Sequence, residues 1–387
     1  VSGGPSVPKA PGSFCPRPSC WAVSVPPEEI CDERRNSSLA RTFRRASGLA
    51  AVGACAGFGA ICGSSLATAA TMGKVALPEL RRLGYSGALS TGALAAGGTL
   101  GILIPPSVIL IIYAILTEQN IAKMFLCAFI PGIIAAIGYI AAIAIYVRIN
   151  KDAGPTNKRI GWIKRLDLFK NIWHIIIIFI VMIGGIYLGF FTPTEGAAVG
   201  AAGTGLIAAF NKNFNFISFL DVIESTAITS GMIFLVLLGA EFFNSFIALS
   251  QLPNILAELT VKHQLTPMIV VGSILILYLF LGCLMDSLAM ILLTIPVFFP
   301  LIMTLDFGMS PEETAIWFGI LTLITVEVGL ITPPVGLNVF IINKMAGDVK
   351  ISETFKGVLP FLLSDIIRVT LLFIFPSITL IMLKIFY

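Results

Sequence analysis

Two long stretches of this chain carry no charged residue: one runs from Ala46 to Gly73 and the other from Leu83 to Thr117. Across all 387 residues, 57% are hydrophobic and only 12% are charged. A soluble domain with this composition would have to bury more apolar surface than it can enclose. Because the apolar runs are long and unbroken rather than short and alternating, the sequence predicts an all-α integral membrane protein and not a membrane barrel.

The first uncharged stretch is interrupted near its middle by Gly63-Ser64-Ser65. Each half has only about 15–17 residues, or about 25 Å of helix, which is short for a membrane crossing. Basic residues flank the stretch on both sides: Arg41, Arg44 and Arg45 before it, and Lys74, Arg81 and Arg82 after it. Since basic residues mark the cytoplasmic side, the pattern predicts a re-entrant hairpin with its tip at 63–65.

The second uncharged stretch is too long for one ordinary helix and contains Pro105-Pro106. Proline removes a backbone donor and disfavours helix in the residue before it, so a broken membrane helix is predicted. A span at about 124–147 then leads to the loop 148–170, which holds seven of the 25 basic residues: Arg148, Lys151, Lys158, Arg159, Lys164, Arg165 and Lys170. This loop is predicted to be cytoplasmic, and its basic residues therefore do not indicate a nucleic-acid partner.

Three further spans are predicted at about 171–191, 194–210 and 227–250, followed by a short polar, interfacial segment at 251–263. Residues 1–40 are rich in Pro, Ser, Arg and Cys and contain no apolar run long enough for a span, so they are predicted to be a disordered or non-native segment. The seven cysteines of the chain show neither a metal-site spacing nor a disulfide framework.

The segment 264–387 repeats the order of features found in 41–147. The corresponding features are a hairpin tip (63–65 and 282–287), a Gly-X-Ser motif (84–86 and 308–310), a double proline (105–106 and 333–334) and a later single proline (131 and 360). Four features in one order are unlikely to coincide by chance, so the sequence predicts an internal duplication.

The second copy is predicted to have the opposite orientation, because an odd number of spans separates the basic loop from its hairpin. No Lys or Arg lies between His263 and Asn343, and the loop 306–313 is acidic and predicted to be periplasmic. Inverted repeats with broken helices are typical of secondary transporters with a site at the membrane midplane. The predicted segments are therefore 1–40 (terminal), 41–147 (first repeat transport elements), 148–170 (basic loop), 171–263 (scaffold spans and interfacial segment) and 264–387 (second repeat transport elements).

Helices that break inside a membrane expose backbone groups at a cost of several kcal/mol each, which indicates that something binds there. The candidate donors are the hydroxyls of Ser64, Ser65 and Ser287, the carbonyls around Gly98, Thr99, Thr332, Pro333 and Gly336, and the amide of Asn338. These are hard oxygen donors suited to Na⁺ or groups suited to a carboxylate. A single membrane serine more often bonds its own backbone, but the clustering at two breaks favours a site.

Two acids, Asp286 and Glu327, lie in apolar runs, where an unpaired carboxylate is costly. Each is a functional candidate, although Asp286 is equally suited to cap the second leg of its hairpin and Glu327 to bond a neighbouring helix. Glu195 follows a break between two scaffold spans, and we expect it to be an acid at a helix N-terminus.

Five segments together resemble one transporter family: GSSLATAATMGKVALPELRRLGYSGALSTGALAAGGTLGILIPPS (63–107), TEQNIAKMF (117–125), FTPTEGAAVGA (191–201), MDSLAMILLTIPVFFP (285–300) and GLITPPVGLNVF (329–340). They are similar to motifs of the large membrane subunit of TRAP (tripartite ATP-independent periplasmic) transporters, and the resemblance covers about residues 40–387.

This resemblance implies a multi-pass permease of the bacterial inner membrane that imports organic acids by an elevator mechanism. The implied acids are dicarboxylates, sialic-acid-like molecules or related carboxylates. Na⁺ would be the coupling ion, with no other cofactor, and the implied partners are a periplasmic substrate-binding protein and a small membrane subunit. Carried over to this sequence, the family's sodium sites fall on Gly63, Ser64, Ser65, Gly98, Thr99, Ser287, Thr332, Pro333 and Gly336, and its substrate site on Pro105, Pro106, Asp286, Pro334 and Asn338.

Two features depart from the family pattern. Cys62 stands where the family commonly has a serine, and three scaffold spans precede the second hairpin whereas none precedes the first. We therefore expect an N-terminally incomplete copy that lacks the scaffold helices of its first repeat and does not transport as written. The alternatives are a truncated, non-transporting remnant or another ion-coupled anion transporter of the same architecture.

An enzyme is disfavoured because no nucleophile with a nearby base accompanies the two acids. A channel is disfavoured because the breaks lie at two opposed hairpins rather than along one continuous polar pore.

Overall fold

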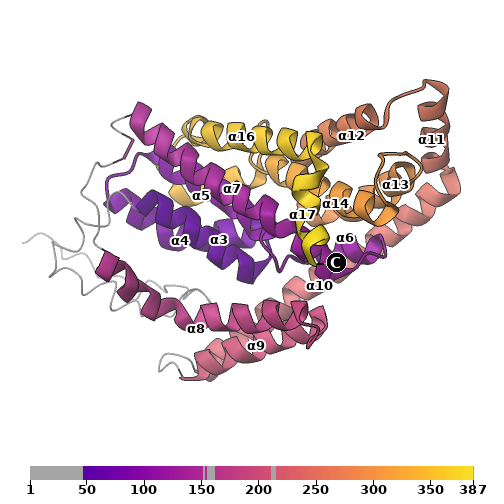
Figure 1. The fold of residues 1–387 in the computed structure, drawn as a ribbon. Coiled ribbons are helices and arrows are strands. Elements are labelled where there is room, and N and C mark those ends of the chain that lie inside the picture. The colour runs from indigo at the N-terminus through magenta and orange to yellow at the C-terminus, as the bar shows by residue number, and fades with distance from the viewer. Residues whose placement is uncertain (1–46, 151–152, 155–161, 211–214, 387) are drawn as a thin grey trace, which may run out of the picture.

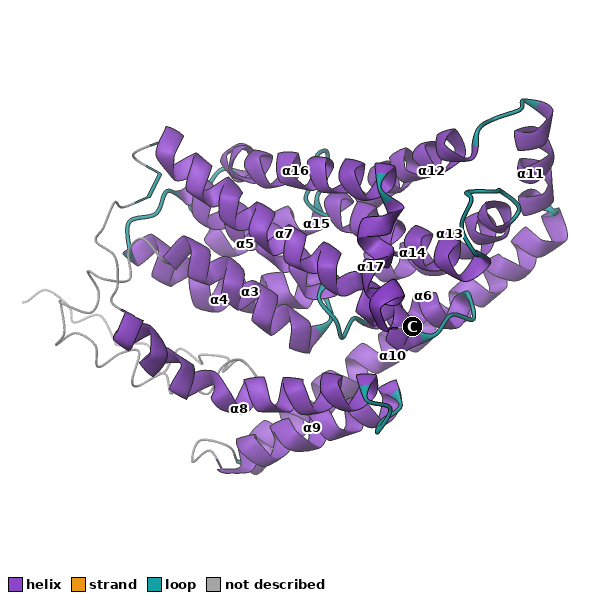
Figure 2. Cartoon of the chain, viewed as in Figure 1, coloured by secondary structure: helices purple, strands orange, loops and turns teal. Residues whose placement is uncertain are grey.

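The computed structural model describes residues 47–150, 153–154, 162–210 and 215–386, and every regular element in this part of the chain is a helix (Figures 1 and 2). The predicted all-α fold is therefore confirmed. The predicted terminal segment 1–40 lies outside the described residues, as do residues 151–152 and 155–161 of the predicted basic loop. The first group of helices comprises α3 (Ser47–Cys62), α4 (Ser65–Arg82), α5 (Gly87–Leu103), α6 (Val108–Leu116) and α7 (Ile121–Ile149).

The remaining helices form a middle group and a last group. The middle group comprises α8 (Trp162–Tyr187), α9 (Pro193–Phe210), α10 (Phe216–Ser250) and α11 (Leu252–Lys262). The last group comprises α12 (Pro267–Gly282), α13 (Ser287–Met303), α14 (Pro311–Gly329), α15 (Leu337–Ala346), α16 (Ile351–Ile374) and α17 (Pro376–Phe386).

Within the described residues, three helices, α7, α10 and α16, are long and apolar enough to cross a membrane by themselves. The pair α5 and α6 qualifies as a fourth crossing if it is counted as one span, and it bends by 43° at the break. The helices α12 and α13 are apolar but shorter. The spans predicted at 171–191 and 194–210 correspond to α8 and α9, which are not among the helices that qualify within the described residues.

The two Gly-X-Ser motifs act in the same way at the start of each long half-helix. Gly84 and Gly308 have φ angles of +85° and +68°, which favour glycine. Two residues later, the Ser86 hydroxyl accepts a hydrogen bond from a backbone N–H of α5, and the Ser310 hydroxyl accepts one from α14. A local sequence signal therefore fixes where both helices begin.

Each hairpin packs against helices of both the first group and the last group. The first hairpin, α3 and α4, contacts α5 of its own group, and α4 also contacts the short helix α15. The second hairpin, α12 and α13, contacts α14, and α13 also contacts the short helix α6. The helices α7 and α16 pack beside this assembly, with α16 lying along α5.

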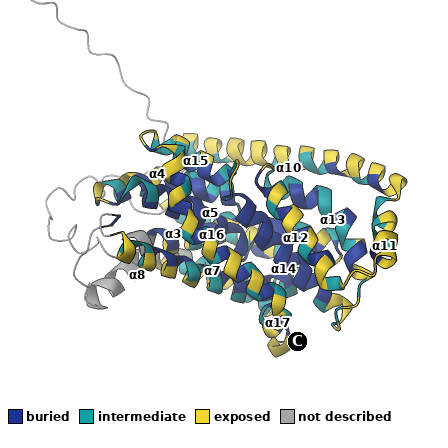
Figure 3. Cartoon of the chain, turned by 90° about the horizontal axis from the view of Figure 1, so that it is seen from above, coloured by how far each residue is buried: buried dark blue, intermediate teal, exposed yellow. Residues whose placement is uncertain are grey.

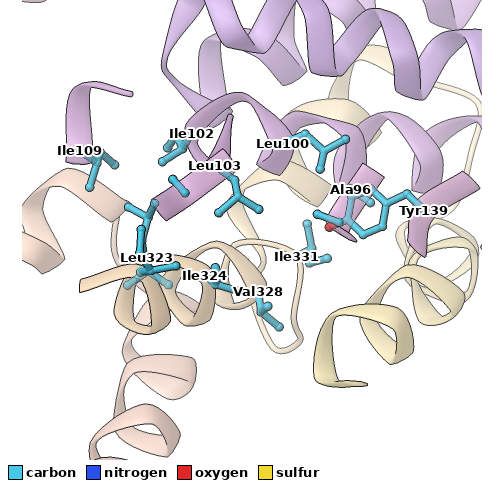
Figure 4. Close-up of a cluster of buried hydrophobic side chains, with 14 of the residues drawn as sticks. Ala96, Leu100, Ile102, Leu103, Ile109, Tyr139, Leu323, Ile324, Val328 and Ile331 are labelled. Atoms are coloured by element: carbon cyan, nitrogen blue, oxygen red, sulfur yellow. The ribbon is translucent and has the colours of Figure 1, made fainter. Parts of the chain in front are cut away.

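A hydrophobic core fills the space between the two long half-helices, α5 and α14 (Figure 4). Side chains of α5 and α7 meet side chains of α14 and of the turn that follows it. The labelled members of this core are Ala96, Leu100, Ile102, Leu103, Ile109, Tyr139, Leu323, Ile324, Val328 and Ile331. Because both breaks immediately follow these buried turns, the core fixes the breaks relative to each other.

Ion pairs and loop contacts identify two opposite ends of this assembly. At one end, Arg81 at the end of α4 pairs with Asp348, and Ser86 N donates to Ala153 O over 3.0 Å. At the other end, Lys123 Nζ lies 2.6 Å from Glu312 Oε1. Helix α7 has 29 residues and, at about 43 Å, joins the two ends. The end of α7, where the basic loop begins, and the 306–313 loop therefore lie at opposite ends of the assembly.

Helices α8, α9 and α10 lie at the periphery of the described helices. Helices α8 and α9 pack mainly on each other, whereas α10 contacts α11 and α13 (Figure 1). Along α10 only Ala240 and Ile247 are buried, and its exposed side is visible as a long yellow edge in Figure 3. An apolar helix with this exposure is suited to contact lipid or another membrane chain.

Several helix boundaries differ from those predicted. Helix α8 begins at Trp162, inside the segment interpreted as a loop, and α10 begins at Phe216 rather than near 227. Charged residues near a membrane surface do not end a helix, so charge alone misplaces these ends. The segment predicted to be interfacial forms the helix α11. Pro376 separates α16 from α17, a break that the sequence interpretation did not include.

Candidate functional site

The tip of the first hairpin is a two-residue turn, Gly63-Ser64, that lies on the first helix break. Gly63 has a φ of +63°, and a Cβ added to it would lie 3.3 Å from the carbonyl oxygen of Pro106. The hydroxyl of Ser64 caps α4 by accepting from Ala67 N over 3.5 Å, and Ser65 is the first residue of α4. The predicted tip and the predicted break therefore contact each other.

The first break spans 104–107 and is largely covered. Pro105 is buried and Pro106 is partly buried, and a cis peptide bond joins the two. Ser107 ends the break, because its hydroxyl accepts from Leu110 N over 3.4 Å and so begins α6. The sequence-predicted substrate positions Pro105 and Pro106 thus lie beneath the first hairpin.

The second hairpin turns at 283–286 and contacts the second break. Asp286 accepts a hydrogen bond from Leu288 N over 3.1 Å, so it caps α13 as its structural interpretation predicted. Ser287 is buried and is the first residue of α13. The thiol of Cys283 lies 3.4 Å from the carbonyl oxygen of Pro333, and this contact joins the tip to the break.

Close glycine contacts bring each hairpin against its break. A Cβ added to Gly59 in α3 would lie 2.2 Å from Gly101 Cα in α5, and one added to Gly329 in α14 would lie 2.6 Å from Gly282 Cα in α12. Gly101 and Gly329 each stand four residues before the first proline of their break. Both contacts require the absence of a side chain, because the backbones themselves touch.

The second break spans 330–336 and is more open than the first. Pro333 and Pro334 are exposed and are also joined by a cis peptide bond. The hydroxyl of Thr332 donates to Val328 O of its own helix over 2.6 Å. Gly336, with a φ of +64°, lies against the carbonyl oxygens of Thr332 and Leu330, so this segment curls back on itself.

Four helices meet around one buried polar cluster, formed by Ser65 of α4, Gly98 of α5, Glu327 of α14 and Asn338 of α15. The Ser65 hydroxyl donates to Glu327 Oε2. A Cβ added to Gly98 would lie 3.2 Å from both Ser65 O and Asn338 Nδ2. Asn338 Nδ2 in turn donates to Ala95 O over 3.3 Å. Three residues predicted from different parts of the sequence are thereby brought together with Glu327.

Two oxygen atoms at this cluster, Glu327 Oε1 and Asn338 Oδ1, are buried and have no hydrogen-bond partner within the described residues. Their side chains are 0–2% exposed. Buried polar atoms are nearly always satisfied in proteins, and hard oxygens are the donors that an alkali cation takes in place of water. The arrangement is therefore suited to a small monovalent cation.

Thr99, although adjacent to Gly98, faces a different cluster. Its hydroxyl bonds Ala96 O over 2.7 Å and lies 2.9 Å from Tyr139 OH. Tyr139 OH donates to Asp365 Oδ2 over 2.7 Å, and Arg368 Nη2 lies 2.8 Å from Asp365 Oδ1. The structure thus separates Thr99 from Ser65.

The sequence interpretation missed Asp365 and Arg368, whose side chains are only 1% and 4% exposed. The available signal was their spacing, since oppositely charged residues three apart within an apolar helix are positioned to pair. Glu195, by contrast, is confirmed as an acid at a helix start: its carboxylate accepts from Thr192 N over 2.8 Å at the head of α9.

An all-helical membrane chain with apolar spans, two interrupted helices and polar groups gathered at the interruptions belongs to the class of membrane transport proteins rather than enzymes. Residues 37–378 match the family described as the DctM component of the tripartite ATP-independent periplasmic transporter. The chain belongs to this family, and it is thus one component of a tripartite transporter, as its motifs predicted.

Relatives with assigned names agree with this membership. The chain is 32% identical over 336 residues to the C4-dicarboxylate TRAP transporter large permease protein DctM of Pseudomonas aeruginosa, a match that covers 86% of this chain and 76% of the relative. It is 34% identical over 330 residues to the sialic acid TRAP transporter permease protein SiaT of Haemophilus influenzae, covering 84% of this chain and 52% of the relative. An isethionate TRAP transporter permease protein of Oleidesulfovibrio alaskensis is 30% identical over 319 residues, with 81% and 48% covered.

Proposed function

We propose that this chain is the permease subunit of a sodium-coupled secondary importer of organic acids in a bacterial inner membrane. A periplasmic binding protein would deliver the acid, and a small membrane subunit would complete the complex. The observation that carries the proposal is the meeting of the first hairpin and both broken helices around Ser65, Glu327 and Asn338.

Sodium is the proposed coupling ion because the groups at the two breaks are hard oxygens in a buried setting. The buried oxygens of Glu327 and Asn338 that have no partner among the described residues support a cation at the first hairpin. The proposed sodium positions are Gly63, Ser64, Ser65, Gly98, Thr99, Ser287, Thr332, Pro333 and Gly336.

The substrate is proposed to be an organic anion, because the named relatives carry C4-dicarboxylates, sialic acid and isethionate, all of which are anions. Its proposed contacts are Pro105, Pro106, Asp286, Pro334 and Asn338. The exposure of Pro334 supports access from outside the protein. A bound cation near Asn338 would attract the acid, which provides a physical basis for coupled uptake.

We further propose that the two groups of helices are inverted repeats that move together as an elevator. The corresponding helices have similar lengths: α3 and α12 both have 16 residues, α5 and α14 have 17 and 19, and α6 and α15 have 9 and 10. The first hairpin ends beside Asp348, whereas the second begins and ends beside the 306–313 loop. Entry from opposite ends supports the inversion.

Uptake into liposomes tests the function. The chain, extended at its N-terminus with the scaffold spans of a relative, is reconstituted with a small membrane subunit and a binding protein of that relative, and the labelled acid is added under an inward sodium gradient. We expect uptake that follows the sodium gradient and persists without ATP. Ser65→Ala and Thr332→Ala are expected to raise the sodium concentration for half-maximal uptake, while Glu195→Gln, a change at the surface, leaves it unchanged.

Uptake driven equally well by a proton gradient in sodium-free buffer would contradict sodium coupling. Uptake that requires ATP would contradict a secondary transporter altogether.

A further inference from the structure

The hydrogen bond from Ser65 to Glu327 joins the first hairpin to the second broken helix. Ser65 begins α4, and Glu327 lies in the last turn of α14, just before the second break. The two residues are 262 positions apart in the chain, and both are buried, at 1% and 2% exposure. Because this hydrogen bond joins two different groups of helices, it forms only while α4 and α14 keep the same position relative to each other.

The chemistry of a hydroxyl limits what Ser65 can do here. A serine hydroxyl has one proton to donate and two lone pairs with which to accept. Because its proton is directed to Glu327 Oε2, its lone pairs point away from that carboxylate. A hydroxyl held in this way offers an oriented oxygen to a cation instead of a freely rotating one.

The charges around Glu327 are not balanced. Its helix packs against α12, α13 and α16, and the charged groups that act on it are Asp286, Asp365 and Arg368. Asp365 and Arg368 pair with each other at 2.8 Å, and Asp286 is a further acid. Glu327 Oε1 has no hydrogen-bond partner in the described structure. A buried carboxylate without a counter-charge is costly, and a cation beside Ser65 would offset that cost.

We propose that Glu327 is a positioning residue for a monovalent cation at the first hairpin. It holds the Ser65 hydroxyl with its lone pairs directed to the ion, and it supplies the nearest uncompensated negative charge. This inference rests on the proposed sodium coupling and deepens it. It makes a residue of the last group of helices responsible for ion affinity at the hairpin of the first group. Mutation of a group that orients a metal ligand commonly lowers the metal affinity about 10- to 100-fold.

A purely structural latch is the competing interpretation. In that case Glu327 would hold the hairpin closed whether or not an ion is present, and its loss would lower stability by the same amount in sodium and in choline. A positioning role instead predicts an effect on the sodium dependence itself.

Thermal unfolding of the full chain in lipid nanodiscs distinguishes the two roles. The melting temperature is measured as sodium chloride replaces choline chloride at constant ionic strength, which gives a half-saturating sodium concentration without any transport. We expect Glu327→Gln to raise this concentration about 10- to 100-fold, and Ser65→Ala to raise it as well. The matched control is Glu195→Gln, the same change at an exposed helix start, which should have no effect.

The double variant identifies the route of the effect. If Glu327 acts through Ser65, the combined shift of Ser65→Ala and Glu327→Gln is smaller than the product of the two single shifts. Glu327→Asp, which keeps the charge but shortens the reach, should recover part of the sodium affinity.

The inference is overturned if Glu327→Gln lowers the melting temperature equally in sodium and choline, if its half-saturating concentration matches that of the unaltered chain, or if the two single shifts multiply fully. A chain whose stability does not respond to sodium at all overturns both this inference and sodium coupling. A chain that responds, with a Glu327→Gln variant that responds identically, overturns the inference alone.

Discussion

A buried network of Tyr139, Asp365 and Arg368 ties α7 to α16, and its disruption should have a large and ordered effect on stability. Tyr139 OH donates to Asp365 Oδ2 over 2.7 Å, and Arg368 Nη2 lies 2.8 Å from Asp365 Oδ1. None of the three residues is more than 4% exposed. Within the described residues, Asp365 provides the only ion pair of Arg368, and Nε and Nη1 of Arg368 have no hydrogen-bond partner.

Removal of the anion should cost more than removal of the hydroxyl. Asp365→Ala leaves a buried guanidinium without a counter-charge, and we expect a loss of about 3–5 kcal/mol in unfolding free energy. Tyr139→Phe leaves the ion pair intact and removes one donor from a charged acceptor, for an expected loss of about 1–3 kcal/mol. Replacing both charges, as Asp365→Ala with Arg368→Met, should cost less than Asp365→Ala alone, because no uncompensated charge remains.

Reversible unfolding in mixed micelles of dodecyl maltoside and sodium dodecyl sulfate measures these differences. Trp317 is a native fluorescent reporter, since it is fully buried in α14 and its indole N–H donates to Leu372 O of α16 over 3.0 Å. The reasoning fails if the unfolding free energy of Asp365→Ala lies within about 1 kcal/mol of that of the unaltered chain. It also fails if the double variant is less stable than Asp365→Ala by as much as Arg368→Met alone destabilises the chain.

Two further predictions concern packing, tested in the same micelles, and topology, tested by labelling in intact cells. A Cβ added to Gly357 would lie 1.8 Å from Ala88 O of α5, so Gly357→Ala should destabilise the chain by about 1–3 kcal/mol or more. Gly53→Ala in α3, where nothing lies within 4 Å, should stay within about 1 kcal/mol of the unaltered chain. For topology, a thiol introduced at Pro311 should be labelled from the periplasmic side and one at Asn150 should not. The reverse labelling pattern would contradict the assignment of the two ends.

The interruptions of the helices could be predicted from the sequence because their causes are local. Gly63-Ser64 places a glycine with positive φ before a capping serine, and Pro105-Pro106 removes two consecutive backbone donors. The second break has the same origin, and both Gly-X-Ser motifs, which the sequence analysis used only as a repeated feature, are found to begin helices. Such signals act within a few residues, so they do not depend on which helices later become neighbours.

The pairing of buried polar groups could not be predicted, because it depends on contacts between distant helices. Nothing near Ser65 in the sequence indicates Glu327, and nothing near Tyr139 indicates Asp365. Helix ends such as the start of α8 were also misplaced, since charge marks a membrane boundary but not the end of a helix. The structural role that the sequence analysis named for each acid is observed: Asp286 caps α13, and Glu327 bonds a neighbouring helix.

The exchange of contacts between the two groups of helices has a mechanical consequence. The first hairpin packs on the short helix α15 of the last group, and the second hairpin packs on the short helix α6 of the first group. An ion held between Ser65 and Asn338 would therefore touch both groups at once. Displacement of the first hairpin alone would break the Ser65–Glu327 hydrogen bond and expose buried polar groups to lipid, at several kcal/mol each. We therefore expect the proposed elevator motion to keep both hairpins and both broken helices together. These elements would slide against α10 and α11, which contact this assembly chiefly through α13.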